Sequence, residues 1–400
     1  MKKNGQGREM IESLPQNEYY ESVSERFGIA QVVLYLSLLA FVVLSFLKNT
    51  NLITYENLYH FVKDLNASAE RVDVWNTDSV SYPTDEVQSF TLYRQGLAVA
   101  GNNSVTVFTA TGRQTVSQTI SYHHPVAVGT GKYLLVYDLG STQYSLYNAY
   151  TQIYAGETDR PISGGTVSNT GMYALTTSSA GSASLVSVYT DQFSLINTYT
   201  KNGYVMDVAI DPKGKSVAIV TSSVSAGAFH TELTVGEIGT ENISASVAVA
   251  DSVAFSVCFT ETDTVSVLCS GGVYTYRTDG SLQNGYSFDG DTVAASALSE
   301  YGVAVSLKAI GTASERSLLV FDKQGNLIYR ETGSRQVDAI SRYENVVYLQ
   351  TAQGIVRLDA ESGVLDEQLC QTDQRNMLAV SGSELLLCSP QKAVYIKFQS

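Results

Sequence analysis

Short apolar runs separated by polar turns recur from about residue 85 to the C-terminus. The stretch DPKGKSVAIVT, residues 211–221, is typical, because a tight turn is followed there by an almost continuously apolar run. Asp suits the first position of a type I turn, Pro presets φ at the second, and Gly closes a bulged hairpin. An apolar run without alternation is typical of a strand that is covered on both faces.

Eight such units follow one another, and in seven of them the turn carries a residue that tolerates positive φ. These turn residues are Gly96, Gly131, Gly171, Gly214, Asp263, Gly302 and Asn345. They lie between 35 and 49 residues apart, which leaves room for four short strands per unit. Second hairpins follow in several units, with turns at Gly280, Gly325 and Gly363.

Four-stranded units repeated about every 40 residues predict an all-β protein with the β-propeller fold. A β-solenoid would repeat at shorter spacing without paired hairpins, and tandem immunoglobulin-like domains would repeat about every 100 residues. We expect an eight-bladed β-propeller, with a seven-bladed ring as the alternative. The propeller domain is expected to span residues 70–400.

The last unit supplies a test of this count, because it has room for only three strands, MLAV, ELLLCS and AVYIKF. A propeller must close its ring, since an open sheet edge invites aggregation. We therefore predict that the segment ERVDVWNTDSVSYP, near residues 71–83, supplies the missing outer strand. The ring would then be closed by N- and C-terminal strands together.

Residues 28–47 form an uncharged apolar run that Arg26 and Lys48 flank. A helix of this length is about 30 Å long, the thickness of the hydrocarbon core of a bilayer. The alternative, a cleaved signal peptide, usually has a shorter apolar run and a small-residue cleavage site. The sequence KNTNLITYENLY that follows is a poor cleavage site, so we predict an uncleaved single-pass transmembrane helix in contact with membrane lipid.

The flanks of this run set the expected orientation in the cell membrane. Basic residues are more frequent before the run than after it, which favours a cytoplasmic N-terminal segment, residues 1–27, and an extracytoplasmic propeller. The segment ITYENLYHFVKDL carries apolar residues at helical spacing. Residues 48–69 are therefore predicted to form a juxtamembrane amphipathic helix and a linker.

Composition excludes several classes of partner and chemistry. Charged residues make up only 16% of the chain, and the formal net charge is −14, so nucleic acid is not expected as a partner. The four cysteines form no CxxC pair, and each stands among apolar residues, which predicts small buried side chains rather than metal ligands. A disulfide remains the alternative. These cysteines are Cys258, Cys269, Cys370 and Cys388.

Two segments resemble the repeat of PQQ-type propellers, in which a strand, an Asp-x-x-x-Gly turn and a second strand form the outer half of a blade. They are GIVRLDAESGVL, residues 354–365, and VFDKQGNLIY, residues 320–329. The whole plan is similar to an uncharacterised family of bacterial membrane-anchored PQQ-like or WD-like propellers. This resemblance implies a short cytoplasmic N-terminus, one helix and an external propeller in the cell envelope.

The chain departs from the quinoprotein dehydrogenases of that fold. Those enzymes carry docking tryptophans and stack their cofactor beside two adjacent cysteines, whereas this chain has one tryptophan, Trp75, and no adjacent cysteines. No PQQ or other cofactor is therefore expected. The sequence also lacks HExxH, GxSxG, Walker, GxGxxG and calcium-loop motifs, so no catalytic residue and no metal site is predicted.

Candidate binding residues come from aligning the units on their turns. The position seven residues before the turn lies near the start of each innermost strand and should face the central channel, and it carries an ionisable side chain at His124, Asp207 and Asp338. The connections SSAGSAS, SSVSAGAFHT and KAIGTASER are longer than their equivalents, and loops on a rigid scaffold often bind ligands. The candidates in these loops are Phe229, His230, Lys308, Glu315 and Arg316. Solvated channel walls and flexible surface loops are the structural alternatives.

These observations favour a non-enzymatic scaffold in the cell envelope that binds an envelope protein or a wall glycan. Two other functions stay open from the sequence. The first is a ligand sensor that signals through a partner of the short cytoplasmic segment. The second is a hydrolase or lyase that uses carboxylates of the channel. Catalytic carboxylates of a propeller can come from distant blades, so no fixed spacing in the sequence would identify a hydrolase or lyase.

Overall fold

The computed structural model describes residues 27, 30–40, 79–149, 151–178, 183–240, 242–250, 252–311, 314–369 and 376–398. The chain divides into two compact units, residues 1–70 and residues 71–400. In the first unit, residues 27 and 30–40 are helical. The described part of the chain contains no helix long and apolar enough to span a bilayer. Residues 28–29 and 41–47 of the predicted membrane span, and the predicted amphipathic helix, lie outside the described residues.

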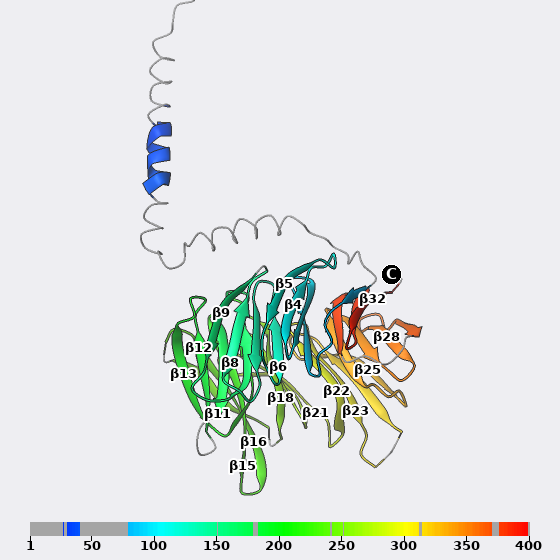
Figure 1. Cartoon of the computed structure of the whole chain (residues 1–400). Coiled ribbons are helices and arrows are strands. Elements are labelled where there is room, and N and C mark those ends of the chain that lie inside the picture. The colour runs from blue at the N-terminus through cyan, green and yellow to red at the C-terminus, as the bar shows by residue number, and fades with distance from the viewer. Residues whose placement is uncertain are drawn as a thin grey trace, which may run out of the picture. The chain divides into compact units, whose positions relative to one another are not determined.

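In the second unit, the described residues form eight antiparallel sheets of four strands, arranged as the blades of a propeller (Figure 1). The eight-bladed prediction is confirmed, and the seven-bladed alternative is wrong. From the innermost to the outermost strand, blades one to four are β2 (Gln88–Tyr93), β3 (Gly96–Gly101), β4 (Ser104–Phe108), β5 (Gln114–Thr119); β6 (Pro125–Gly129), β7 (Leu134–Asp138), β8 (Gln143–Tyr147), β9 (Gln152–Glu157); β10 (Ile162–Val167), β11 (Tyr173–Ser178), β12 (Ala183–Tyr189), β13 (Leu195–Asn202); and β14 (Tyr204–Ile210), β15 (Ser216–Ser225), β16 (Ala228–Glu237), β17 (Ile243–Ala250).

The remaining blades repeat this order, and the last of them combines strands from both ends of the unit. Blades five to eight are β18 (Ala254–Glu261), β19 (Thr264–Cys269), β20 (Gly272–Arg277), β21 (Leu282–Ser287); β22 (Thr292–Ser299), β23 (Gly302–Lys308), β24 (Arg316–Phe321), β25 (Leu327–Gly333); β26 (Ala339–Tyr343), β27 (Val346–Gln350), β28 (Gly354–Asp359), β29 (Leu365–Leu369); and β30 (Asn376–Ser381), β31 (Glu384–Cys388), β32 (Lys392–Lys397), β1 (Ser79–Ser81). Strand β1 pairs antiparallel with β32, which confirms the predicted closure by residues 71–83.

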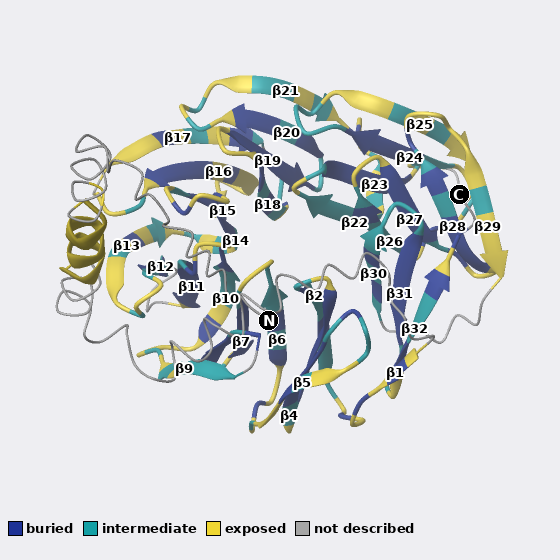
Figure 2. Ribbon diagram, turned by 90° about the horizontal axis from the view of Figure 1, so that it is seen from above, coloured by how far each residue is buried: buried dark blue, intermediate teal, exposed yellow. Residues whose placement is uncertain are grey.

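The first strands of neighbouring blades lie side by side around the centre of the ring (Figure 2). Because the strands of each blade are antiparallel, the connections between blades and the turns between second and third strands lie on the same face. We call this the start face, because each innermost strand begins there. The turns between first and second strands lie on the opposite face.

The turn at residues 211–216 shows why the sequence repeats as it does. Asp211 is buried, and its two carboxylate oxygens accept hydrogen bonds of 2.6 Å from the backbone N–H groups of Lys213 and Lys215. Gly214 has a φ of +69°, a left-handed conformation in which a side chain would be strained. The Asp-Pro-Lys-Gly stretch therefore aligns β14 and β15, and Asp211 has a structural role.

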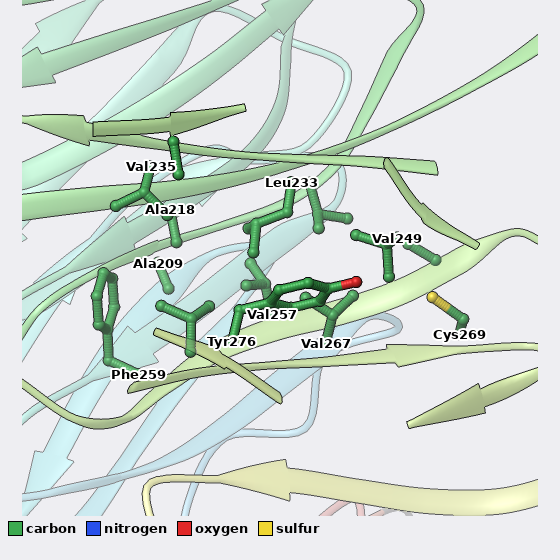
Figure 3. Close-up of a cluster of buried hydrophobic side chains, with 14 residues drawn as sticks. Ala209, Ala218, Leu233, Val235, Val249, Val257, Phe259, Val267, Cys269 and Tyr276 are labelled. Carbon is green, nitrogen blue, oxygen red and sulfur yellow. The ribbon is translucent and has the colours of Figure 1, made fainter. Parts of the chain in front are cut away.

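Apolar side chains fill the space between neighbouring blades. One buried cluster lies at each of the eight junctions of the described ring. At the junction of blades four and five, Leu233 and Val235 of β16 pack against Val257 and Val267 of the next blade, with Tyr276 beside them (Figure 3). Because both faces of a blade take part in such clusters, the second strands are apolar without alternation, as the sequence predicted.

Candidate binding face

Asp207 lies in β14 at a β-bulge, next to the innermost strand of the following blade. Its Oδ1 atom accepts a hydrogen bond of 2.8 Å from the backbone N–H of Val208. Its Oδ2 atom accepts one of 2.9 Å from the N–H of Val257 in β18. Burial raises the pKa of the Asp207 carboxyl to about 6, and the two hydrogen bonds act against this rise. Asp207 thus joins blades four and five.

Two serines make the same kind of connection between other blades. Ser89 Oγ of β2 accepts a hydrogen bond of 3.0 Å from the N–H of Ala127 in β6, and Ser341 Oγ of β26 accepts one of 2.9 Å from the N–H of Ala379 in β30. Ser89 stands at the same register as Asp207, and Ser341 lies three residues after the equivalent position, so side-chain oxygens of innermost strands link neighbouring blades. This structural role accounts for the position of Asp207 without a ligand.

His124 and Asp338 stand at equivalent starts of innermost strands, and both are exposed. The N–H of His124 donates to Oδ1 of the buried Asp138 at 2.7 Å, so its backbone is fixed. Asp338 Oδ1 accepts a hydrogen bond of 3.0 Å from Gln336 Nε2. Among the described contacts, no hydrogen bond or ion pair joins His124, Asp207 and Asp338. A shared channel site of these three residues stays a prediction.

Strands β15 and β16 form a hairpin that projects from blade four on the start face (Figure 1). Each strand has ten residues, and their pairing continues to Ser225 and Ala228, beyond the last pairs with β14 and β17. Ala226 and Gly227 have φ angles of +50° and +81°, which suit the two-residue turns that connect twisted strands. The predicted long loop is therefore an ordered hairpin.

The projecting hairpin exposes a cross-strand apolar pair. Val224 of β15 lies opposite Phe229 of β16, and their side chains are 65% and 50% exposed. On the same face of β15, Val220 packs into the junction with blade five, so the pair extends this side of the blade into solvent. His230 is exposed and lies opposite Ser223. Phe229 and His230, predicted from a long connection, thus share the hairpin.

The other candidate loop residues lie in blade six. Lys308 ends β23, and Arg316 begins β24 directly opposite it. Lys308 and Glu315 are exposed, and Arg316 is half-buried. The N–H of Ala309 donates to the carbonyl oxygen of Glu315 at 3.1 Å, which closes the connection between the two strands. These three residues, predicted from one long connection, lie together on the start face.

Arg316 also lines a cavity of about 260 Å³ at the junction of blades six and seven. Its wall includes Ser306, Ser317, Glu331 and Arg335. Leu318, Val337 and Leu349 belong to the apolar cluster of this junction and also line the cavity. The lining thus combines charged and polar groups with an apolar part. Arg335 was missed from the sequence, since it stands in a short connection between blades.

The described cysteines form no disulfide. Cys258, Cys269 and Cys388 are free, and burial raises the pKa of each thiol to about 12. Cys370, the fourth cysteine of the sequence, lies outside the described residues. Within the described ranges, no three His, Cys, Asp or Glu side chains gather closely enough to hold a metal ion.

Residues 70–398 match a protein family described as "Family of unknown function (DUF5711)". The chain belongs to this family. Membership covers the whole ring of the DUF5711 chain and agrees with the resemblance to a propeller family without an assigned function. No curated protein matches the DUF5711 chain.

Solved structures of low sequence identity share the fold of the DUF5711 chain. BamB from Moraxella catarrhalis is similar with a TM-score of 0.53 and 11% identity, over 81% of this chain and 97% of that chain. Sqt1 from Chaetomium thermophilum is similar with a TM-score of 0.52 and 13% identity, over 82% and 98%. Kuenenia stuttgartiensis hydrazine synthase is similar with a TM-score of 0.50 and 12% identity, over 81% and 99%. These likenesses show a β-propeller and no more.

Proposed function

We propose that this protein is a membrane-anchored scaffold whose propeller binds a partner protein of the cell envelope through the β15–β16 hairpin. The observation that carries the proposal is the exposed pair of Val224 and Phe229 at the end of a rigid blade. Exposed aromatic and aliphatic side chains on a fixed element are typical anchors of protein interfaces. This chemistry favours a protein over a wall glycan as the partner.

The proposed location in the cell membrane rests on the N-terminal sequence. Residues 28–47 carry no charge over a length that suits a bilayer, and basic residues precede this run more often than they follow it. The segment fixes the propeller to the membrane, with residues 1–27 in the cytoplasm. A reporter that is active only outside the cytoplasm, fused after residue 400, is expected to be active, and the same reporter fused before residue 1 is expected to be silent.

A crosslinking experiment in the native cell tests the proposed interface. A photoreactive amino acid replaces Val224 or Phe229 in the full chain, and crosslinked products are identified after purification. We expect one reproducible envelope protein from both positions. Leu195 and Leu282, each 57% exposed, provide matched control positions on other blades. The same products from all four positions would contradict the proposal, because crosslinking would then report surface exposure alone.

Substitution provides the second arm of the test. The double variant Val224→Ser with Phe229→Ser removes the apolar anchors and keeps the strands, since serine is tolerated on an exposed strand surface. Recovery of the partner is expected to fall about tenfold or more, in line with the loss of interface anchors. The control variant Leu195→Ser with Leu282→Ser should recover the partner as the unchanged chain does.

A further inference from the structure

The cavity between blades six and seven combines charge with apolar surface in an unusual way for this acidic chain. Arg316 and Arg335 contribute two positive charges at the cavity wall, and Glu331 together with Glu367, which pairs with Arg335, contributes two negative charges. The chain as a whole has a net charge of −14. Because both carboxylates lie beside Arg335, the guanidinium of Arg316 is the positive charge that remains for a negatively charged group.

Arg335 carries an unused hydrogen-bond donor. Its Nη2 atom lies 3.5 Å from Glu367 Oε1 and 3.9 Å from Glu331 Oε1, so one end of the guanidinium is held by two carboxylates. Its Nη1 atom is buried and makes no hydrogen bond within the described part of the chain. A buried donor without an acceptor is costly, and an oxygen atom of a ligand would remove that cost.

Arg316 is the second cation of the cavity wall. Among the described residues, its guanidinium forms no ion pair and no hydrogen bond with another side chain, although it is half-buried. The hydroxyl groups of Ser306, Ser317 and Ser334 add donors on the same wall. Guanidinium groups bind carboxylates with paired, parallel hydrogen bonds, which makes arginine the usual residue for this recognition.

The size and floor of the cavity restrict the rest of the ligand. Its volume of about 260 Å³ lies below the roughly 300–1,000 Å³ of sites that enclose whole drug-sized ligands. The apolar part of the lining, Leu318, Val337 and Leu349, suits a short aliphatic group. Glu331 disfavours a dianion such as phosphate more than a monoanion, since like charges repel.

We infer that this cavity binds a carboxylate joined to a short aliphatic group. Two sources share this chemistry, the C-terminal residue of a peptide chain and a free small amino acid. The small volume favours one end of a longer molecule, so the peptide terminus is the expected source. The site is separate from the β15–β16 hairpin, and it stands whether or not that hairpin binds a protein.

Isothermal titration calorimetry of the full chain in a mild detergent tests this inference. The probe is an acetylated Ala-Ala-Val peptide with a free C-terminal carboxylate, and the comparison is the same peptide with a C-terminal amide. The acid is expected to bind at least about tenfold more tightly than the amide, as hydrogen bonds between charged groups imply. If free valine binds as tightly as the peptide acid, the natural ligand is a free amino acid. If free valine binds more weakly, the natural ligand is the C-terminal residue of a peptide chain.

Three variants locate the binding. Arg316→Gln and Arg335→Gln each remove one cation and are expected to weaken binding of the acid about tenfold or more. Gly333 lines the cavity, and a Cβ atom there would meet no heavy atom within 4 Å. Gly333→Val therefore fills the cavity without changing its charge or forcing a clash, and it is expected to abolish binding.

Arg330→Gln is the matched control, because Arg330 is an exposed arginine of β25, the strand that ends at Gly333. It pairs with Leu319, which packs on the other face of the blade. This variant should bind the acid as the unchanged chain does. The inference is wrong if acid and amide bind equally, if phosphate competes as well as the peptide, if no heat of binding is measured at millimolar peptide, or if the three cavity variants bind unchanged while remaining folded. Thermal unfolding of each variant checks the last condition. Loss of peptide binding in the hairpin double variant is not expected, so failure of the two proposals is distinguishable.

Discussion

Asp207 Oδ2 in blade four accepts a hydrogen bond of 2.9 Å from the backbone N–H of Val257 in blade five. The two residues are fifty positions apart in the sequence, and this contact joins the innermost strands of two sheets. The carboxylate is largely shielded from water, and burial raises its pKa to about 6. The ring is therefore linked at this junction by a group whose charge changes near neutral pH.

The stability of the ring is expected to depend on the ionisation of Asp207. The native pKa of about 6 lies above the ordinary value of 3.8, so the native state binds the proton more tightly than the unfolded state. The stabilisation is fully present below about pH 4 and is lost as the pH rises through about 6. A difference of about two pKa units corresponds to roughly 2–3 kcal/mol.

Urea unfolding of the wild type and of Asp207→Asn between pH 4 and pH 7 measures this contribution. The wild type should lose roughly 2–3 kcal/mol relative to the variant over that range, because asparagine does not ionise. Asp263→Asn is the control, since Asp263 is exposed. A constant difference between the wild type and Asp207→Asn across the range would contradict the raised pKa of Asp207.

Closure of the ring by β1 gives a second prediction. Val80 is 5% exposed and belongs to the cluster between blades eight and one, whereas the neighbouring Ser79 points to solvent. Val80→Asp places an unpaired carboxylate in an apolar junction and is expected to lower the free energy of unfolding by roughly 3 kcal/mol or more. Ser79→Asp adds the same charge one residue earlier and should change it by less than about 0.5 kcal/mol.

Chemical denaturation of the full chain, monitored by far-UV circular dichroism, measures the free energy of unfolding of both variants. The comparison isolates the buried position, because charge and chain location are matched. Equal stability of Val80→Asp and Ser79→Asp would mean that the β1–β32 pairing does not contribute to closure.

The repeat could be read from the sequence because each blade depends on local chemistry. The turn at Asp211 and Gly214 needs particular residues, and the strand after it is buried on both faces, so both leave a direct mark in the sequence. Closure by residues near Val80 followed from counting, since three strands at the C-terminus required a fourth. Such features are set by neighbours in the chain.

The candidate site was predicted only in part, because its geometry joins distant segments. Arg316 was found from a long loop, but Gly333 ends β25 and Arg335 lies in the short connection after it, whose composition is ordinary. The cavity forms only when β24, β25 and β27 meet at the junction of two blades. The link from Asp207 to Val257 was also invisible, since its register predicted exposure to the channel rather than a bond between strands.

The turn of the projecting hairpin gives a third prediction. Ala226 has a φ of +50°, which alanine tolerates poorly, and Gly227 follows it with a φ of +81°. Asparagine before glycine is the preferred pair for such a turn, so Ala226→Asn should stabilise the end of the hairpin by roughly 0.5–1 kcal/mol.

Amide hydrogen exchange at Ser225 and Ala228, the hydrogen-bonded pair that closes the hairpin, reports the local opening of this turn. Protection of these amides should rise about threefold in Ala226→Asn, while the exchange of amides in the other blades stays unchanged. Ala226→Val is the opposite variant, because a β-branched residue is strained at positive φ. Slower exchange in Ala226→Val than in the unchanged chain would contradict the assigned turn.

Arg342 gives the last prediction, and it concerns the junction of blades six and seven. Its Nη1 atom donates hydrogen bonds of 3.1 Å and 2.6 Å to the carbonyl oxygens of Val303 and Phe321, and its Nε atom donates one of 2.8 Å to the backbone carbonyl oxygen of Glu344. The side chain is 7% exposed, and burial lowers its pKa to about 10. One arginine of β26 thus provides hydrogen bonds to carbonyl oxygens of β23 and β24.

Arg342→Met keeps much of the side-chain volume and removes every donor, which leaves two carbonyl oxygens of blade six without this partner. The free energy of unfolding is expected to fall by roughly 2–4 kcal/mol, since unpaired buried acceptors cost about 1–3 kcal/mol each. Arg330→Met is the control, because Arg330 is exposed, and it should change stability by less than about 0.5 kcal/mol. Equal urea midpoints for the two variants would show that the Arg342 hydrogen bonds do not hold the junction together.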